Sequence, residues 1–156
     1  MKTRFLLSLI VFFILNFGAL AIGRLFTGSG VPSDWYVNLN KAPWTPPGWV
    51  FGAAWTTIMI CFSIFMAYAW SNNSNRRLLL AMYVIQLILN IAWNPLFFHF
   101  HAMGIALIDI SALTVLVASF IFVYRKEMSF KVFLISPYFI WLCIATSLNA
   151  YALLSN

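Results

Sequence analysis

The sequence predicts an all-α integral membrane protein, a bundle of five transmembrane helices in a single domain over residues 1–156. Apolar residues make up 63% of the chain and charged residues only 8%, whereas soluble domains carry about 45–50% and 25%. A soluble fold of this length has too much surface to bury so many apolar side chains. The apolar runs are also too long and too uniform for barrel strands, which alternate over about ten residues.

Five apolar segments reach about 20 residues, the length at which a helix crosses a bilayer. These predicted spans cover 5–26, 46–70, 78–98, 103–124 and 130–154. The first contains Ala19-Leu20-Ala21, which imitates the cleavage site of a signal peptide. Because the apolar run continues past this site to Phe26, we expect a retained transmembrane helix.

Three of the four connections are short, around 71–75, 99–102 and 125–129, and the fourth is long, over 27–45. We expect Thr45 to cap the second helix, with Pro46 and Pro47 in its first turn, where their missing N–H groups cost nothing. A long loop in a compact protein is often a lid, so we expect this one to cap the bundle. The alternative is an interfacial belt of tryptophans such as Trp44 and Trp49.

Positive charge is distributed unevenly between the two sides of the predicted bundle. One side has only Arg24 and Lys41, and the other has Lys2, Arg4, Arg76, Arg77, Arg125, Lys126 and Lys131. The positive-inside rule then places the N-terminus in the cytoplasm and the long loop and C-terminus outside the cytoplasmic membrane. The net charge of +6 lies at the ends of apolar runs, not on a basic surface with interleaved aromatics, so we expect no nucleic-acid partner.

The third predicted helix carries Gln86, Asn90 and Asn94 on one face, beside Trp93. Buried amides of this kind either bond neighbouring helices, for about 0.6–2 kcal/mol each, or contact a ligand, and both interpretations stay open. Pro95 should bend the helix near Asn90.

The ionisable and sulfur-containing side chains give few candidates for chemistry. Asp109 is the only acid within a span, and it is either a functional group or a structural pin. His99 and His101 are expected at a surface turn and are weak haem ligands. Cys61 and Cys143 have no metal-ligand spacing and are interpreted as small core residues, so no metal site or disulfide is expected.

Large aromatic residues on the second, third and fifth helices are suited to lining a flat cavity for a planar, apolar ligand. Met59 follows Trp55 by one helical turn, and Ala145 follows Trp141 in the same way. Any one such row of side chains along a helix can equally serve to pack neighbouring helices together. Arg24 or Lys41 near the loop is a candidate partner for ligand carboxylates. The sequence contains no Ser-His-Asp order, HExxH, CxxC or phosphate-binding glycine loop.

Three motifs together resemble the TspO family, also called tryptophan-rich sensory proteins or peripheral benzodiazepine receptors, over nearly the whole chain. They run Trp35-Tyr36 to Trp44-x-Pro46-Pro47-x-Trp49-Val50-Phe51-Gly52-x-x-Trp55-Thr56, then Gln86-Leu87-x-Leu89-Asn90-x-x-Trp93, and finally Pro137-Tyr138-x-x-Trp141 with Leu148-Asn149. The resemblance implies a five-helix bundle, commonly dimeric, with one ligand cavity capped by the first loop. It implies binding of protoporphyrin IX and haem-like tetrapyrroles, and of synthetic isoquinoline or benzodiazepine-type ligands, with no required cofactor.

Most of the expected pocket is carried over from these motifs, and Met59 is added from its helical spacing. The ligand-binding candidates are Trp35, Tyr36, Pro46, Trp55, Met59, Asn90, Trp93, Trp141, Ala145 and Asn149. Two features depart from the family pattern. The loop reads Lys41-Ala42-Pro43-Trp44, with its proline displaced by one position, and no basic residue follows Tyr151, so cholesterol is not expected.

The leading hypothesis is therefore a membrane receptor or carrier for tetrapyrroles. The alternative is an enzyme that degrades bound protoporphyrin with light or oxygen, in which Trp55 and Trp141 act as catalytic electron donors. A secondary transporter is disfavoured, because five spans without visible inverted repeats are unlike most transporter folds.

Overall fold

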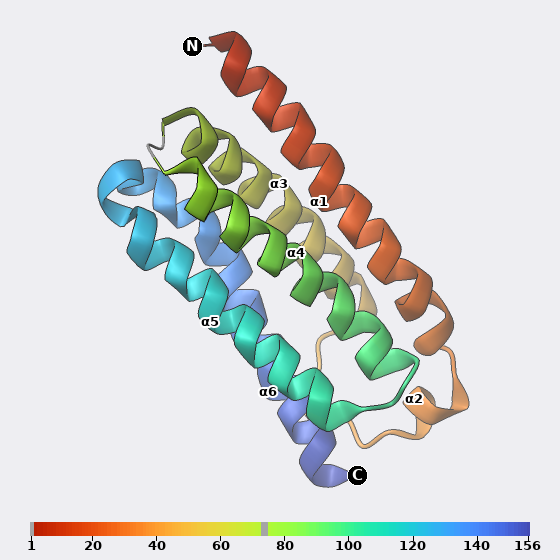
Figure 1. Ribbon diagram of the computed structural model, residues 1–156. Helices are drawn as coiled ribbons and strands as arrows, with labels where there is room; N and C mark the ends of the chain where they lie inside the picture. Colours follow the sequence, from red (N-terminus) through yellow and green to blue (C-terminus); the bar gives the residue numbers. More distant parts are fainter. Residues whose placement is uncertain (1, 73–74) are drawn as a thin grey trace.

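The computed structural model describes residues 2–72 and 75–156, and in this part of the chain every regular element is helical (Figure 1). The elements are α1 (Lys2–Gly30), α2 (Asp34–Asn38), α3 (Gly48–Asn72), α4 (Arg76–Phe98), α5 (Met103–Met128), the 3₁₀ helix η1 (Ser129–Ile135) and α6 (Ser136–Ser155). The all-α prediction is confirmed, with five long helices in the predicted order.

Four segments of the described chain are long and apolar enough to cross a membrane. Three correspond to α1, α3 and α4, and the fourth, Met103–Ser155, includes α5, η1 and α6 as one helical stretch of 53 residues. Figure 1 shows α5 and α6 running side by side and joined by a tight reversal, so this fourth segment supplies two of the five long helices.

The second long helix begins two residues later than predicted. α3 starts at Gly48, and Thr45 lies outside it, with Oγ1 donating a hydrogen bond to the Ala42 carbonyl at 2.7 Å. The predicted N-cap at Thr45 is therefore wrong. Thr45 and Pro46 each precede a proline, and a residue in that position is disfavoured in helical conformation, so the helix starts only after Pro47.

The fifth span also begins later than predicted, because 129–135 forms the 3₁₀ helix η1 and α6 starts at Ser136. Ser129 adopts a positive φ of 49°, which ends α5 and turns the chain. Pro137 lies in the first turn of α6, where its missing N–H costs no hydrogen bond. The turn predicted at 71–75 includes residues 73 and 74, which lie outside the described residues, and α3 continues to Asn72.

The long helices pack in a ring. α1 lies against α3 and α4, α4 against α5, and α5 against α6, while α6 meets α3 along a looser seam that closes the ring. Buried aromatic side chains fill the centre. The Phe62 ring packs edge-on against Tyr138 at 5.4 Å and Phe120 at 5.6 Å, measured between centroids. The interior of the bundle is thus a packed aromatic core.

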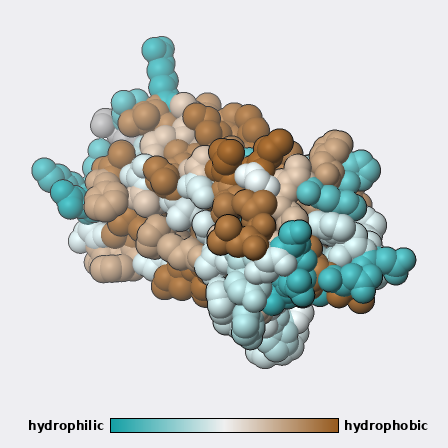
Figure 2. Space-filling model, turned by 90° about the horizontal axis from the view of Figure 1, so that it is seen from below, coloured by the Kyte–Doolittle hydropathy of each residue, from teal (hydrophilic) through white to brown (hydrophobic). Residues whose placement is uncertain are grey.

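The outside of the bundle is hydrophobic, as expected where lipid replaces water. Large apolar side chains stay exposed along the helices, among them Leu7, Ile88, Ile108 and Phe122. Figure 2 shows hydrophobic side chains across much of the visible surface, with hydrophilic ones projecting at its edges. Cys143 also lies on this exposed surface, so its assignment to the core is wrong, whereas Cys61 is half-buried, and both thiols are free.

The two ends of the bundle differ. The N-terminus lies at one end, and the C-terminus lies at the other together with α2 and the connection from α1 to α3 (Figure 1). Since a chain with five crossings must end on the side opposite its start, this arrangement agrees with the count of five spans.

Candidate functional site

The segment between α1 and α3, residues 31–47, is bound to the C-terminal part of α6. The Asn40 backbone N–H donates to Oδ1 of Asn156 at 2.9 Å, and the Asn40 side-chain amide donates to the Ser155 carbonyl at 3.0 Å. Trp44 Nε1 donates to the Ser147 hydroxyl at 3.1 Å. These bonds hold both the middle and the end of the segment against one helix.

The short helix α2 brings Trp35 and Tyr36 to the connection between α4 and α5. The Trp35 ring stacks on His101 with centroids 4.0 Å apart and packs edge-on against Phe97 at 5.5 Å. The Tyr36 ring lies 5.5 Å from Phe98, and burial raises the pKa of its phenol above the ordinary value. The two predicted loop residues therefore contact the far end of α4.

His101 and Lys41 both make contacts within this region that the sequence did not predict. His101 lies in the predicted turn with a positive φ of 53°, but it also forms the stacking partner of Trp35, which the sequence did not indicate. Lys41 extends its ammonium over the Tyr36 ring at 4.7 Å and donates to the Val37 carbonyl at 3.1 Å. Lys41 is thus engaged within the loop in this structure.

Trp93 and Asn149 are bonded to each other. Trp93 Nε1 in α4 donates to Oδ1 of Asn149 in α6 at 3.0 Å, and the Asn149 amide donates to the Met103 carbonyl at the start of α5, also at 3.0 Å. Trp93 also stacks on Phe97 with centroids 5.1 Å apart. Two predicted site residues therefore join three helices just below α2.

The three amides of α4 have separate roles. Gln86 donates to the Tyr138 hydroxyl at 2.7 Å, and Asn94 accepts from the Thr27 hydroxyl at 2.9 Å. For these two residues the interpretation as helix–helix bonds is confirmed. Asn90 is different, because it is 7% exposed and its side-chain amide forms no hydrogen bond within the described residues.

A second group of predicted residues lies on α3 and α6. The Trp55 ring packs edge-on against Tyr138 with centroids 6.0 Å apart, and Trp141 packs edge-on against Phe51 at 5.2 Å. Met59 is fully buried and Ala145 is half-buried against the same core. Trp93 packs against this core and also against the aromatic cluster near α2, so it lies between the two groups.

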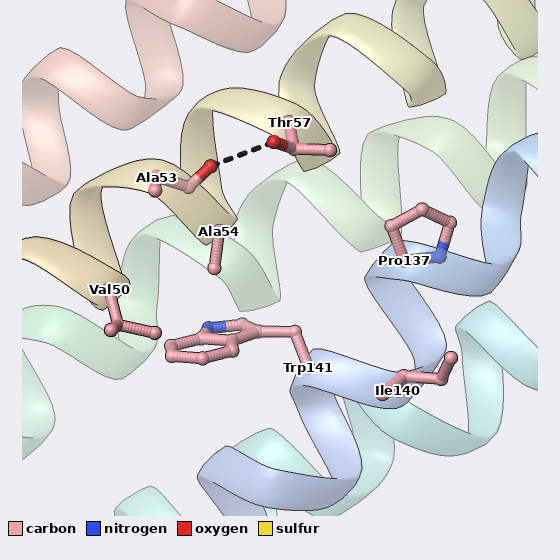
Figure 3. A pocket seen from close by; sticks show the side chains of 7 residues that line it. All are labelled: Val50, Ala53, Ala54, Thr57, Pro137, Ile140 and Trp141. Atoms are coloured by element: carbon pink, nitrogen blue, oxygen red, sulfur yellow. Dashed lines mark hydrogen bonds between the residues drawn. The ribbon is translucent and has the colours of Figure 1, made fainter. Parts of the chain in front are cut away.

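An open pocket of about 300 Å³ lies on the seam between α3 and α6 (Figure 3). In Figure 3 the Trp141 indole extends from α6 toward Val50 and Ala54 of α3. Of the predicted residues only Trp141 lines this pocket, which is completed by Val50, Ala53, Ala54, Thr57, Pro137 and Ile140. The small side chains Ala53 and Ala54 of α3 leave this space opposite Trp141, and only the packing of α3 against α6 brings them together.

Two further predicted residues stay outside both groups. Pro46 is half-buried in the segment that precedes α3. Asp109 is buried in α5, and its Oδ2 has no hydrogen-bond partner within the described residues. The structural pin proposed as one alternative for Asp109 is therefore not formed through this oxygen.

The helical bundle, its apolar exterior and its interior of indoles and amides define a polytopic membrane protein with a candidate site between the helices. The model of the TspO/MBR family matches residues 9–154, so the chain belongs to that family. The resemblance stated from the motifs is confirmed.

Individual relatives agree over most of their length. The chain is 36% identical to the tryptophan-rich sensory protein of Cereibacter sphaeroides over 126 residues, which cover 80% of this chain and 78% of that protein. It is 36% identical to the tryptophan-rich protein TspO of Archaeoglobus fulgidus over 135 residues, 86% of this chain and 87% of the relative. It is 30% identical to the human translocator protein over 138 residues, 86% of this chain and 80% of that protein.

Proposed function

We propose that this protein is a membrane receptor or carrier that binds a tetrapyrrole, protoporphyrin IX or a haem-like molecule, between its helices and beneath residues 31–47. The observation that carries the proposal is the side chain of Asn90, which is 7% exposed and forms no hydrogen bond within the described residues, one turn away from Trp93. A ligand that supplies a polar group at this position would give the Asn90 amide a hydrogen bond, which is worth about 0.5–1.5 kcal/mol.

The aromatic surroundings of Asn90 suit a planar ligand. Trp93 stacks on Phe97, and Trp35 meets the same phenylalanine from the loop side. Trp35 and Trp93 are both half-buried, so part of each ring is left for a flat ligand to cover, and aromatic surfaces combine large buried areas with a preference for offset stacking. A tetrapyrrole offers such a face and carries carboxylates at one edge, for which Arg24 or a released Lys41 is the candidate partner.

The segment 31–47 serves as the cap in this proposal. Its contacts with α6 and with His101 support a closed arrangement, in which two bonds of Asn40 and the stacking of Trp35 hold the loop down. Ligand entry requires these contacts to open. The hydrogen bonds from Asn40 and Trp44 to α6 are exposed, and exposed hydrogen bonds are typical of segments that open locally at low cost.

The proposal extends to the orientation in the membrane and to assembly. α1 and α4 begin at the end of the bundle that is distant from α2 (Figure 1), and Arg4 and Arg76 lie in their first turns. This basic end supports an N-terminus in the cytoplasm and a loop on the outer side. Family membership supports a homodimer and binding of synthetic isoquinoline or benzodiazepine-type ligands as further parts of the proposal.

The test is a titration of the purified protein with protoporphyrin IX in the dark, followed through quenching of tryptophan fluorescence. Asn90→Ala should weaken saturable binding about tenfold, which corresponds to one buried hydrogen bond. The matched control is Ile88→Ala on the exposed face of the same helix, which should bind like the unmodified protein. No saturation at micromolar porphyrin, or equal losses in both variants, would refute the proposal. A product that forms under light and disappears in Trp141→Phe would instead favour the enzyme.

A further inference from the structure

A second pocket lies at the end of the bundle opposite α2, where three helix ends meet. It has a volume of about 350 Å³ and is lined by Arg4, Leu7 and Ser8 of α1, Trp70 and Ser71 of α3, and Arg76 of α4. Nothing in the proposed tetrapyrrole site involves these residues.

The two arginines of this pocket have their charge uncompensated. Neither Arg4 nor Arg76 forms an ion pair within the described residues. The only acids of the chain are Asp34, Asp109 and Glu127, and none of them lines the pocket. An anion that enters the pocket therefore meets two guanidinium groups without a competing carboxylate.

The two serine hydroxyls beside the arginines already donate within their own helices, so the guanidinium groups are the charged donors of the pocket. The Ser8 hydroxyl donates to the Arg4 carbonyl, and the Ser71 hydroxyl donates to the Ala67 carbonyl, each at 2.8 Å. The Arg76 guanidinium carbon lies 5.3 Å from the centroid of the Trp70 ring. This cation–π contact holds the guanidinium plane in place, and a planar guanidinium binds phosphate oxygens through two parallel hydrogen bonds.

The helix ends add a smaller contribution of the same sign. Among the described residues that line the pocket, those of α1 and α4 come from helix N-termini, which carry partial positive charge, and those of α3 come from a helix C-terminus. Two N-termini against one C-terminus favour an anion over a cation.

We propose that this pocket binds the phosphate of an anionic membrane lipid headgroup. The position supports a lipid as the source of the phosphate, because the pocket lies at the end of three helices that are long and apolar enough to cross a membrane, and lipid headgroups lie where such helices end. Leu7 lines the pocket and is 60% exposed, so an apolar surface for the acyl chains continues directly from the arginines. Basic residues immediately next to spanning helices attract anionic lipids by about 1 kcal/mol each.

The test is native mass spectrometry of the full-length protein in detergent with short-chain phosphatidylglycerol or phosphatidylcholine. We expect phosphatidylglycerol to be retained at least tenfold more strongly than phosphatidylcholine. The double variant Arg4→Gln/Arg76→Gln should lower that retention at least tenfold, and Arg76→Lys, which keeps the charge but loses the planar fork, should lower it severalfold.

The matched control is Arg125→Gln/Lys126→Gln, which removes the same charge from the exposed end of α5 at the same side of the bundle. It should change retention less than twofold. Equal losses in the two double variants would overturn the proposal, because they would indicate general attraction to a basic surface. Binding of inorganic phosphate as tightly as the lipid would also overturn it, since the acyl chains would then contribute nothing. Elution volume and helical circular dichroism establish that each variant is folded before comparison.

Discussion

The indole N–H of Trp93 donates a hydrogen bond of 3.0 Å to the side-chain carbonyl of Asn149, which in turn holds the Met103 carbonyl at the start of α5. One polar connection thus links α4, α5 and α6 directly beneath α2. In an apolar interior such a bond is retained because neither partner can find water. The same two residues would form the wall next to Asn90 in the proposed tetrapyrrole site.

Replacing Trp93 with phenylalanine should destabilise the folded protein by about 0.6–2 kcal/mol, the range for hydrogen bonds between membrane helices. Phenylalanine keeps one six-membered ring but lacks the five-membered ring with its N–H, so Oδ1 of Asn149 loses its donor while it stays buried. Thermal unfolding in detergent measures this change. Trp49→Phe is the control, because Trp49 is 75% exposed. A Trp93→Phe variant as stable as that control would contradict the importance of this bond.

The bond from Gln86 to the Tyr138 hydroxyl should appear as coupling between the two residues. Tyr138→Phe leaves the Gln86 amide without its 2.7 Å acceptor and should cost about 0.6–2 kcal/mol. The double variant Gln86→Leu/Tyr138→Phe should cost less than the sum of the single changes, because it leaves no donor unpaired. Strict additivity in unfolding free energies would show that the two residues do not interact.

Gly30 should tolerate no side chain. A Cβ at this position would lie 2.6 Å from the Cβ of Phe98, too close to the backbone of α4 for a rotamer change to relieve. Gly30→Ala should therefore destabilise the protein by about 1–3 kcal/mol, as overpacking does. Gly18→Ala is the matched control in the same helix, since nothing lies within 4 Å of its added Cβ, and it should be neutral or slightly stabilising. Similar melting temperatures for the two variants would be inconsistent with this packing.

The hydrogen bonds of Asn40 should control how often the segment 31–47 opens. Asn40→Ala removes the side-chain donor to Ser155, worth about 1 kcal/mol, so amide exchange in the segment should rise about fivefold. Asn38→Ala is the control, because Asn38 is exposed and forms no side-chain hydrogen bond within the described residues. Hydrogen exchange followed by mass spectrometry measures the exchange rate of the segment 31–47 in the two variants. Equal protection in both variants would remove the support for a held-down cap.

Many residues of the candidate site could be named from the sequence, mainly through its motifs. Trp93 and Asn149 were both carried over from the motifs that resemble the TspO family. The sequence did not predict which residue each of these side chains takes as its hydrogen-bond partner. Gln86, Asn90 and Asn94 share one face of α4. Within the described chain, however, Gln86 bonds to α6, Asn94 bonds to α1, and the Asn90 side chain forms no hydrogen bond. The difference depends on which neighbouring helix passes each turn, and helical periodicity does not contain that information.

The sequence by itself determined the fold class and the family. The length and apolar content of each run predicted five membrane helices, because a helix satisfies its own backbone hydrogen bonds in lipid, and the tryptophan-rich motifs indicated the TspO/MBR family. The tertiary structure alone decided how the candidate site is divided. It placed Trp35 on His101, brought Trp93 to Asn149, and left a pocket beside Trp141. Contacts between residues distant along the chain follow from how whole helices pack. That packing depends on many small interactions, and no single sequence motif predicts their sum.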